Sequence, residues 1–529
     1  MKLLFSFSFL LLLLQLKAQT IIHVDASASG TNTGASWTNA YTDFQDAIDV
    51  AVTGDEIWLK RGVYLPSKDK TGNNAPSNNR NKTFFFNKDI KVYGGFVGTE
   101  TALNQRNCSA ASTTMLSGDL GVVNTYSDNT YHIVYTENVS SNFLMDCITI
   151  SGGYSEIVQL EGAGWYNDGS GTGNNSNPTL QQIRFERNAA ALGGAMFNNG
   201  SGGGNASPNY DNCTFWGNLG EYGGAVNNHG ENNGNASPTF TNCLFDSNIA
   251  GTGGAVFNGG EFGNASPSFT DCNFDSNHST AQAGAVYNHG ALGISIPSFT
   301  DCDFSHNHTN GDGGAVYNFG VGGAADATYT NVSFTHNRAS RNGGAINNFG
   351  ASPVINNCQF IADTAYSHGG AIYNGGNQGG ISSPIVTNAI FEGNRANFWG
   401  GAVFNDGLAG LSSPVFANCK FVENIAVRGG AIVNDGRIGI SSPSYTNCIF
   451  SQNEATDQGG AVNNLGGNGQ CSPTFINCSF SMNSAIAGGA MISDGTNGSC
   501  LAQITNCILW DNGSLLSLQP LRLQPHTVT

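Results

Sequence analysis

Charged side chains are scarce in this chain of 529 residues. They make up 11% of it, whereas a typical soluble protein has about 25%. The 20 Lys and Arg residues are outnumbered by 37 Asp and Glu residues, and residues 188–337 contain eleven acids but no Lys or Arg. A surface that reads nucleic acid needs clustered cations. The sequence therefore argues against a nucleic-acid partner.

Long apolar runs are missing beyond the N-terminus. Residues 1–19 combine Lys2, an apolar run over residues 3–14 and the small residue Ala18 before Gln19, which is typical of a signal peptide. No later run reaches the ~18 apolar residues of a membrane-spanning helix. We therefore expect an exported monomer, secreted or held at the cell surface, without a transmembrane segment.

Helix-length periodicity is also rare, and a repeat of about 30 residues takes its place. Gly-Gly-Ala recurs from Gly193 to Gly488 in steps of 26 to 31 residues, and Phe-x-x-Asn keeps the same step from Phe185 to Asn483. Each unit joins short alternating apolar runs with Gly/Asn loops. This pattern predicts strands separated by turns.

A single unit of this size cannot fold alone. Ordering its backbone costs about 1–2 kcal/mol per residue, whereas burying one apolar side chain returns only about 1.5–3 kcal/mol. Stacking equivalent strands about 4.8 Å apart supplies the missing contacts. The sequence therefore predicts an all-β fold, a right-handed parallel β-helix (β-solenoid) of about twelve regular coils.

The expected organisation has five parts. A signal peptide covers 1–19, an N-terminal cap 20–66, irregular coils 67–160, regular 30-residue coils 161–512, and a tail that fits no repeat 513–529. In the cap, Thr42 and Gln45 are predicted to form a capping box and Gly54 to end an amphipathic helix. This helix should close the bottom of the solenoid.

Equivalent positions of the repeat form columns. The residue after Gly-Gly-Ala is always apolar and is predicted to face the core. The next position varies, which indicates an outward face, and its aromatic members form a predicted stripe for a carbohydrate or protein ligand. An alternative is that these rings only stiffen the rod. The stripe consists of Phe257, Tyr287, Tyr317, Tyr373 and Phe404. The asparagines that follow, from Asn198 to Asn464, are predicted to form a hydrogen-bonded ladder.

Ten of the 13 cysteines are assigned to one further column, in which Val332 and Ala389 stand in for them in other coils. This exchange indicates a buried small apolar residue and free thiols, because stacked strands lie farther apart than a relaxed disulfide requires. The column is read as Cys147, Cys213, Cys243, Cys272, Cys302, Cys358, Cys419, Cys448, Cys478 and Cys507. Cys471 and Cys500, at matching loop positions, are instead the candidates for a disulfide.

Histidines recur at the repeat spacing close to aspartates. His278 should lie over His308, and His306 over His336. Stacked imidazoles and carboxylates can bind a divalent cation, Ca²⁺ included, although solvated side chains at the edge of the coils explain the same pattern. The aspartates concerned are Asp271, Asp275, Asp301 and Asp303.

The paired motifs Gly-Gly-Ala-[Ile/Val] and Phe-x-x-Asn resemble the repeats of chlamydial polymorphic outer membrane proteins. Over residues 20–512 the chain resembles secreted bacterial right-handed β-helix proteins of the pectin-lyase-like superfamily. The lead-in segments His23-Val24-Asp25 and Tyr93-Gly94-Gly95-Phe96 are similar to such proteins of Bacteroidota-type bacteria. The resemblance implies the fold, while its members include adhesins, structural rods and polysaccharide enzymes.

Two functions follow from this resemblance. The preferred one is a non-catalytic adhesin or binding rod, because most coils repeat the same residues and a catalytic site must differ from its neighbours. The alternative is a polysaccharide lyase or glycoside hydrolase, which requires paired carboxylates and a basic group. Its nearest candidates are Asp406 and Asp435 of successive coils with Arg428 and Arg437, although ordinary surface variation also accounts for them.

Overall fold

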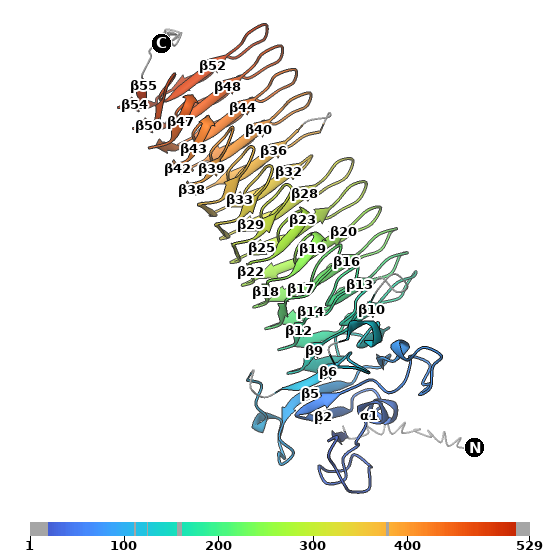
Figure 1. Ribbon diagram of the computed structural model, residues 1–529. Coiled ribbons are helices and arrows are strands. Elements are labelled where there is room, and N and C mark those ends of the chain that lie inside the picture. Colours follow the sequence, from blue (N-terminus) through green and yellow to red (C-terminus); the bar gives the residue numbers. More distant parts are fainter. Residues whose placement is uncertain (1–19, 110–112, 124, 156–160, 377–379, 515–529) are drawn as a thin grey trace, which may run out of the picture.

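The computed structural model describes residues 20–109, 113–123, 125–155, 161–376 and 380–514. The predicted signal peptide and residues 515–529 of the predicted tail lie outside these ranges. The described chain forms a rod of stacked coils (Figure 1). Four parallel sheets of 16, 14, 15 and 10 strands run along it. The all-β parallel solenoid expected from the repeat is therefore confirmed.

One coil illustrates the unit. It runs through β17 (Thr239–Thr241), β18 (Leu244–Asp246), β19 (Ile249–Thr252) and β20 (Val256–Gly259), and each strand belongs to a different sheet. The β17 and β20 strands pair in register with their equivalents one coil on. A long Gly/Asn loop then leads to the next coil (Figure 1).

The core is built from columns of inward side chains. Phe245, Phe274 and Phe304 are fully buried and stack face to face, with ring centroids 4.7 and 4.5 Å apart. Corners between strands use left-handed residues, such as Asn242 with φ 52°. At Gly253 (φ 65°) an added Cβ would lie 2.4 Å from the carbonyl oxygen of Val256. The first glycine of Gly-Gly-Ala therefore fits a corner that no other residue can occupy without strain.

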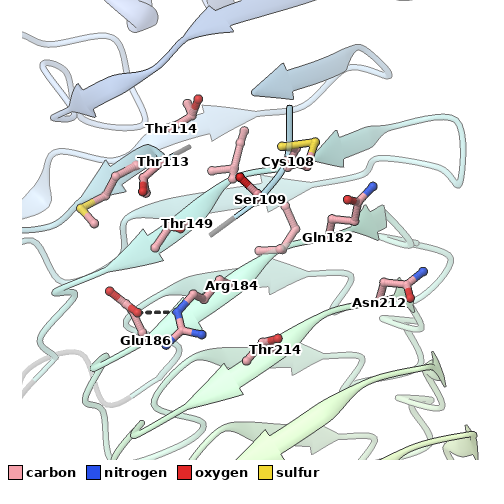
Figure 2. Close-up of a pocket in the computed structure, with 14 residues that line it drawn as sticks. Cys108, Ser109, Thr113, Thr114, Thr149, Gln182, Arg184, Glu186, Asn212 and Thr214 are labelled. Carbon is pink, nitrogen blue, oxygen red and sulfur yellow. Dashed lines mark hydrogen bonds and ion pairs between the residues drawn. A yellow bond between two sulfur atoms is a disulfide. The ribbon is translucent and has the colours of Figure 1, made fainter. Parts of the chain in front are cut away.

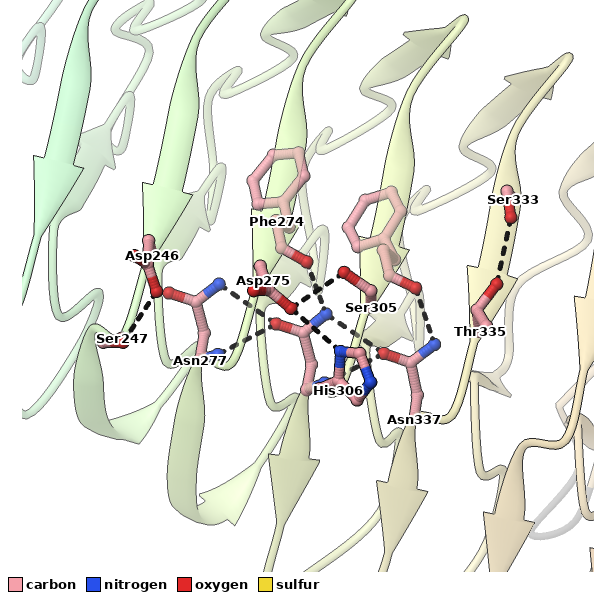
Figure 3. A network of polar contacts seen from close by, with 12 residues as sticks. Asp246, Ser247, Phe274, Asp275, Asn277, Ser305, His306, Ser333, Thr335 and Asn337 are labelled. Carbon is pink, nitrogen blue, oxygen red and sulfur yellow. Dashed lines mark hydrogen bonds and ion pairs between the residues drawn. The ribbon is translucent and has the colours of Figure 1, made fainter.

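Two buried asparagine ladders join the coils. In the predicted ladder, Asn258 donates to Asn288 and Asn288 to Asn318, at 2.8 and 2.7 Å between side-chain nitrogen and oxygen. This prediction is confirmed. The second ladder is formed by the asparagine of Phe-x-x-Asn. Asn277 donates to Asn307 at 3.0 Å (Figure 3), and it also donates to the carbonyl oxygen of Phe245 at 2.9 Å. Both ladders satisfy polar groups that would otherwise be buried unpaired.

The N-terminal end carries the expected helix, with different limits. Helix α1 (Phe44–Val50) ends four residues before Gly54, and Asp43 caps it by accepting the amide of Gln45 at 2.9 Å. Thr42 is thus not the cap, because Asp43 is the last extended residue before the helix. The buried face of α1 packs on β1 (Ile21–Val24), β2 (Glu56–Lys60) and β4 (Phe84–Phe86).

At the other end, β53 (Gln503–Thr505), β54 (Ile508–Trp510) and β55 (Gly513–Ser514) complete the last coil. Because β55 pairs with Ser484 and Ala485, residues 513 and 514 still follow the repeat, although they were assigned to the irregular tail. Within the described residues, no helix has the length and apolar character to cross a bilayer.

Candidate functional site

The predicted aromatic stripe stacks as expected but is not open to solvent. Tyr287 lies between Phe257 and Tyr317, with ring centroids 5.4 and 5.2 Å apart, and Tyr373 stacks on Phe404 at 5.5 Å. Except for half-buried Phe257, however, these side chains are at most 7% exposed. The expectation of an outward binding stripe is therefore corrected.

The stripe is buried because its rings lie along the rod surface and pack on their neighbours. Tyr287 and Tyr317 form one small cluster with Ala283, and Tyr373 and Phe404 form another with Val433 and Leu465. At Gly375, an added Cβ would lie 2.8 Å from Cε1 of Tyr373. The glycine two residues after the ring thus leaves space for it to lie flat.

The four residues predicted as a catalytic set do lie in neighbouring coils. Asp406 ends β40 (Val403–Asp406) and is the register partner of Asp435, which ends β44 (Ile432–Asp435). Asp406 accepts the hydroxyl of Tyr373, and the amide of Leu408 at 3.0 Å. Burial raises the pKa of Asp406.

Asp435 forms a bidentate ion pair with Arg437. Arg437 donates Nε and a terminal nitrogen to its two oxygens at 2.9 and 2.7 Å, and this hydrogen bonding raises the pKa of Arg437. Arg428 instead pairs with Asp457 at 2.8 Å. Asp406 and Asp435 are only 7% and 2% exposed. Both carboxylates therefore hold the turn after their strand rather than face an open cleft.

Beside these carboxylates lies a surface that we name the aromatic–arginine patch: Tyr366, His368, Phe398, Trp399, Arg428 and Arg437. Tyr366 and Phe398 are 59% and 48% exposed, and their ring centroids lie 6.3 Å apart. Trp399 stands 5.3 Å from His368. The guanidinium carbons of Arg437 and Arg428 lie 5.1 and 5.9 Å from the Trp399 ring centroid.

Each arginine of the patch is ion-paired with an aspartate, Arg437 with Asp435 and Arg428 with Asp457. Burial lowers the pKa of His368 to about 4, so that its imidazole is neutral at pH 7. Its buried Nδ1 has no hydrogen-bond partner. Exposed rings can stack on apolar faces of a ligand, while guanidinium groups donate to its oxygens. The patch thus combines the two features of a polar-ligand surface.

Sequence reasoning found the two arginines of this patch but missed its rings. His368, Trp399 and Arg428 pair with one another in successive coils at the position that precedes Gly-Gly-Ala. That column varies freely, from Leu192 to Gln458. A tryptophan in a variable column, in a chain with only six tryptophans, was the available signal.

The histidines stack as predicted without gathering a metal-binding group. His278 and His308 lie 4.9 Å apart, and His306 and His336 lie 5.5 Å apart, between ring centroids. His306 contacts Asp275 through Nδ1 at 3.1 Å (Figure 3), whereas Asp301 accepts the amide of Asn331. Throughout the described ranges, no three His, Cys, Asp or Glu side chains are placed to hold a metal ion. Asp271 and Asp303 add no such group.

Two expectations about cysteine are corrected. Cys147 is not a free thiol of the column but forms a disulfide with Cys108 (Figure 2). By strand register, Cys147 is equivalent to the corner residue Gln182, and the column position of its coil is occupied by Ile148, the equivalent of Ile183. Cys471 and Cys500 are free thiols in hydrogen-bond contact, not a disulfide. The other column members are free as expected.

Residues 301–318 and 331–348 match the Chlamydia polymorphic membrane protein repeat. The two stretches lie one coil apart, at equivalent positions. The resemblance to these repeats is therefore confirmed for two coils. No curated protein matches the chain.

Several solved structures are similar in overall course. The match to the catalytic domain of a GH87 alpha-1,3-glucanase in complex with nigerose covers 93% of this chain and 69% of the glucanase chain, with TM-score 0.39 and 11% identity. A mannuronic acid specific polysaccharide family 6 lyase from human gut microbiota covers 81% and 82%, with TM-score 0.38 and 10% identity. A PL6 family lyase from Pseudopedobacter saltans covers 96% and 97%, with TM-score 0.36 and 9% identity. These activities are properties of those proteins.

Proposed function

We propose that the protein is an exported, non-catalytic rod that binds extracellular carbohydrate through the aromatic–arginine patch. The observation that carries this proposal is the exposure of Tyr366 and Phe398 beside Trp399 and two guanidinium groups. Aromatic faces pack against the apolar faces of sugar rings, and arginine donors reach sugar oxygens. The patch takes the role first assigned to the buried stripe.

Location outside the cytoplasm is part of the proposal. It is supported by the signal-like residues 1–19 and by the two segments that match a membrane protein repeat. A rod of coils whose core residues recur from coil to coil is suited to holding one surface patch at a fixed distance from its ends.

One observation keeps a polysaccharide lyase or hydrolase as a second candidate. Burial raises the pKa of Asp406, and a carboxyl group with a raised pKa can act as a general acid. Its neighbour Asp435 stands one coil away. Against this role, Tyr373 and Arg437 already occupy these two carboxylates.

The proposal is tested by retention of the purified protein on insoluble neutral and acidic polysaccharides. We expect Phe398→Ala combined with Trp399→Ala to reduce retention at least ~10-fold, because stacking contacts commonly dominate such surfaces. Phe262→Ala, which removes another exposed ring at 54% exposure, should retain full binding. Retention that survives the double change, with unaltered thermal unfolding, would refute the patch as the site.

The same incubations distinguish the second candidate. If the soluble fraction contains newly released oligosaccharides, the protein is an enzyme. Release that disappears in Asp406→Asn and Asp435→Asn, while retention persists, would establish these carboxylates as the catalytic groups and overturn the non-catalytic proposal.

A further inference from the structure

The loops that follow β20, β24 (Val286–His289) and β28 (Val316–Phe319) carry an exposed apolar surface. They are among the long loops that project from one side of the rod (Figure 1). Leu292 leans toward the next loop, because a Cβ added at Gly322 would lie 3.0 Å from its Cδ2. Five side chains, each 43% to 54% exposed, form what we name the loop-tip apolar surface: Phe262, Leu292, Ile294, Ile296 and Val321.

Two of these residues hold a strained backbone conformation. Phe262 and Leu292 have φ 54° and 55°, in the left-handed region that is unfavourable for large side chains and is usual for glycine and asparagine. The flanking coils have Asn233 and Gly322 at the same position. Among the core clusters of the described chain, none contains Phe262 or Leu292. Strain that brings no packing inside the rod points to a role in binding.

The loop after β24 also departs from the repeat at two polar positions. Ile294 pairs with Asn264 of the coil before, which donates to Asn235 at 2.7 Å. Ile296 stands where that coil has Ser266, ahead of the proline in each case. Apolar residues thus replace polar ones at exposed positions, beside the two left-handed tips. The packing of the solenoid does not require this difference from the neighbouring coil.

Acidic side chains lie at both ends of the surface. Glu261 directly precedes Phe262, and exposed Asp326 follows Val321 in the last of the three loops. Neither carboxylate belongs to an ion pair of the described residues. The whole surface lies within residues 188–337, where the chain has no Lys or Arg. The apolar centre therefore has a negative rim that no cation of these loops compensates.

The other titratable groups at these loops add no positive charge at pH 7. His229 and His289, which end β16 (Val226–His229) and β24, have pKa values lowered by burial. Burial and the nearby charge of Glu261 raise the pKa of Glu231, whose Oε1 lies 3.5 Å from Nδ1 of His229. The loops thus present apolar side chains and carboxylates to a partner.

We infer that the loop-tip apolar surface docks a basic amphipathic segment of another protein. The apolar side chains of this segment cover Leu292 and Ile294, and its Lys or Arg side chains pair with Glu261 and Asp326. An amphipathic helix of two turns has an apolar stripe about 10 Å long, close to the span of three strands stacked about 4.8 Å apart. The inference is independent of the carbohydrate site proposed for the aromatic–arginine patch.

Charge complementarity selects this occupant over the alternatives. A second copy of the chain would bring two negative rims together, and an anionic lipid surface would meet the same repulsion. A neutral apolar ligand would gain nothing from Glu261 or Asp326.

The test is titration of the full chain with a synthetic helical peptide of about 14 residues, which has leucines along one face and lysines at both ends. We expect Phe262→Asn with Leu292→Asn to weaken peptide binding at least ~10-fold. Because asparagine tolerates a positive φ, this variant should unfold at the same urea concentration as the wild type or at a higher one.

Two controls separate the surface from general effects. Ile438→Asn makes the same kind of change at the same loop position of another coil, where the residue is 67% exposed with φ 61° but follows an arginine. It should bind the peptide as the wild type does. Glu261→Gln with Asp326→Asn should weaken binding and remove most of its salt dependence. Asp271→Asn with Asp301→Asn makes the same charge change at two exposed corners and should leave binding unchanged.

Each outcome decides. Unchanged affinity in the Phe262 and Leu292 double variant, or a lower unfolding midpoint, would overturn the docking surface. An equal loss in the Asp271 and Asp301 pair would mean that only net charge matters and would overturn it too. Equal binding of a peptide with glutamates in place of lysines would overturn the basic partner. Tighter binding to anionic vesicles than to the peptide, or dimerisation that the double variant abolishes, would assign the surface to lipid or to a second copy. Polysaccharide retention that survives the double variant would support two separate sites.

Discussion

Asn337 donates its side-chain amide to Oδ1 of Asp363 at 3.0 Å, in a column where the neighbouring rungs are asparagine pairs. Asp363 is fully buried, and its Oδ2 has no partner. In the next rung, the equivalent atom of Asn394 is an amide that donates to the carbonyl oxygen of Phe360 at 2.9 Å. A proton on Oδ2 would restore the missing donor. Burial accordingly raises the pKa of Asp363 to about 8.

The raised pKa of Asp363 predicts that the unfolding free energy of the protein falls as the pH rises. Between pH ~4 and 8 the folded state keeps the Asp363 proton and the unfolded state loses it. Because the pKa of Asp363 is higher in the folded state than in the unfolded state, its stabilising contribution is complete below the pKa of the unfolded state. The contribution is lost as the pH rises to the pKa of the folded state. Relative to Asp363→Asn, the wild type should lose up to about 1.4 kcal/mol of unfolding free energy per pH unit in this window. Urea unfolding at several pH values measures the difference.

The variant also provides its own control. Asp363→Asn should be more stable than the wild type at pH 7, whereas most buried substitutions destabilise. A constant stability difference between the two proteins from pH 4 to 8 would show that Asp363 keeps the same charge in both states, contrary to this account.

The buried and exposed ladders should differ sharply in their energetic value. Asn288→Ala leaves Asn258 without its acceptor and Asn318 without its donor, inside the rod. Each unpaired buried group costs about 1–3 kcal/mol. Asn418 lies at an exposed corner between strands, where its backbone φ is 57°. Its side-chain nitrogen donates to Oδ1 of Asn388, the equivalent residue one coil away, at 3.2 Å. Asn418→Gly should cost under ~0.5 kcal/mol, since water replaces the partner and glycine accepts the positive φ. Similar losses in both variants would contradict the distinction.

The solenoid could be predicted from sequence because the same packing problem is solved in every coil. Phe304 and Asn307 recur with partners of their own kind, so one period determines core, corner and ladder positions. The prediction of an exposed aromatic stripe was wrong because the repeat pattern does not determine how much of a side chain is open to solvent. Tyr287 lies outside the main core, which contains its neighbour Val286, but an outward side chain can still be buried by its neighbours along the surface. Alternation determines the face of a strand and not the solvent exposure.

The remaining errors have local causes. Cys147 stands three residues before Ile150, whereas Cys213 stands two before Phe215, so a shift of one residue moved it from the core to the corner. The aromatic–arginine patch escaped because its members come from three coils and from a variable column. Its composition depends on which loop residues the stacking brings together, and single repeats do not contain that information.

Cys500 should react with alkylating reagents faster than the cysteines of the buried column. Cys500 is half-buried, and a hydrogen bond from Cys471 lowers its pKa. Cys448 is buried, and its contact with Cys419 raises its pKa to about 12. Since the thiolate is the reactive form, iodoacetamide should alkylate Cys500 first in the native protein at pH 8. Mass spectrometry should show that Cys500→Ser removes the fast phase and Cys448→Ser does not. Equal rates at all cysteines would mean that solvent reaches the column.

A charge placed in the aromatic column should unfold the rod at lower denaturant concentration. Phe304 is fully buried between Phe274 and Phe334, with ring centroids 4.5 and 5.0 Å away, so that coils on both sides prevent local rearrangement. Phe304→Asp removes these contacts and buries an unpaired carboxylate, which predicts a loss of at least ~4 kcal/mol. The preceding residue provides the control: Asp303 is exposed on the opposite face of the same strand, and Asp303→Ala should change stability by less than ~0.5 kcal/mol. Urea unfolding followed by circular dichroism compares the two. If Asp303→Ala were the more damaging change, the inward and outward faces would be reversed.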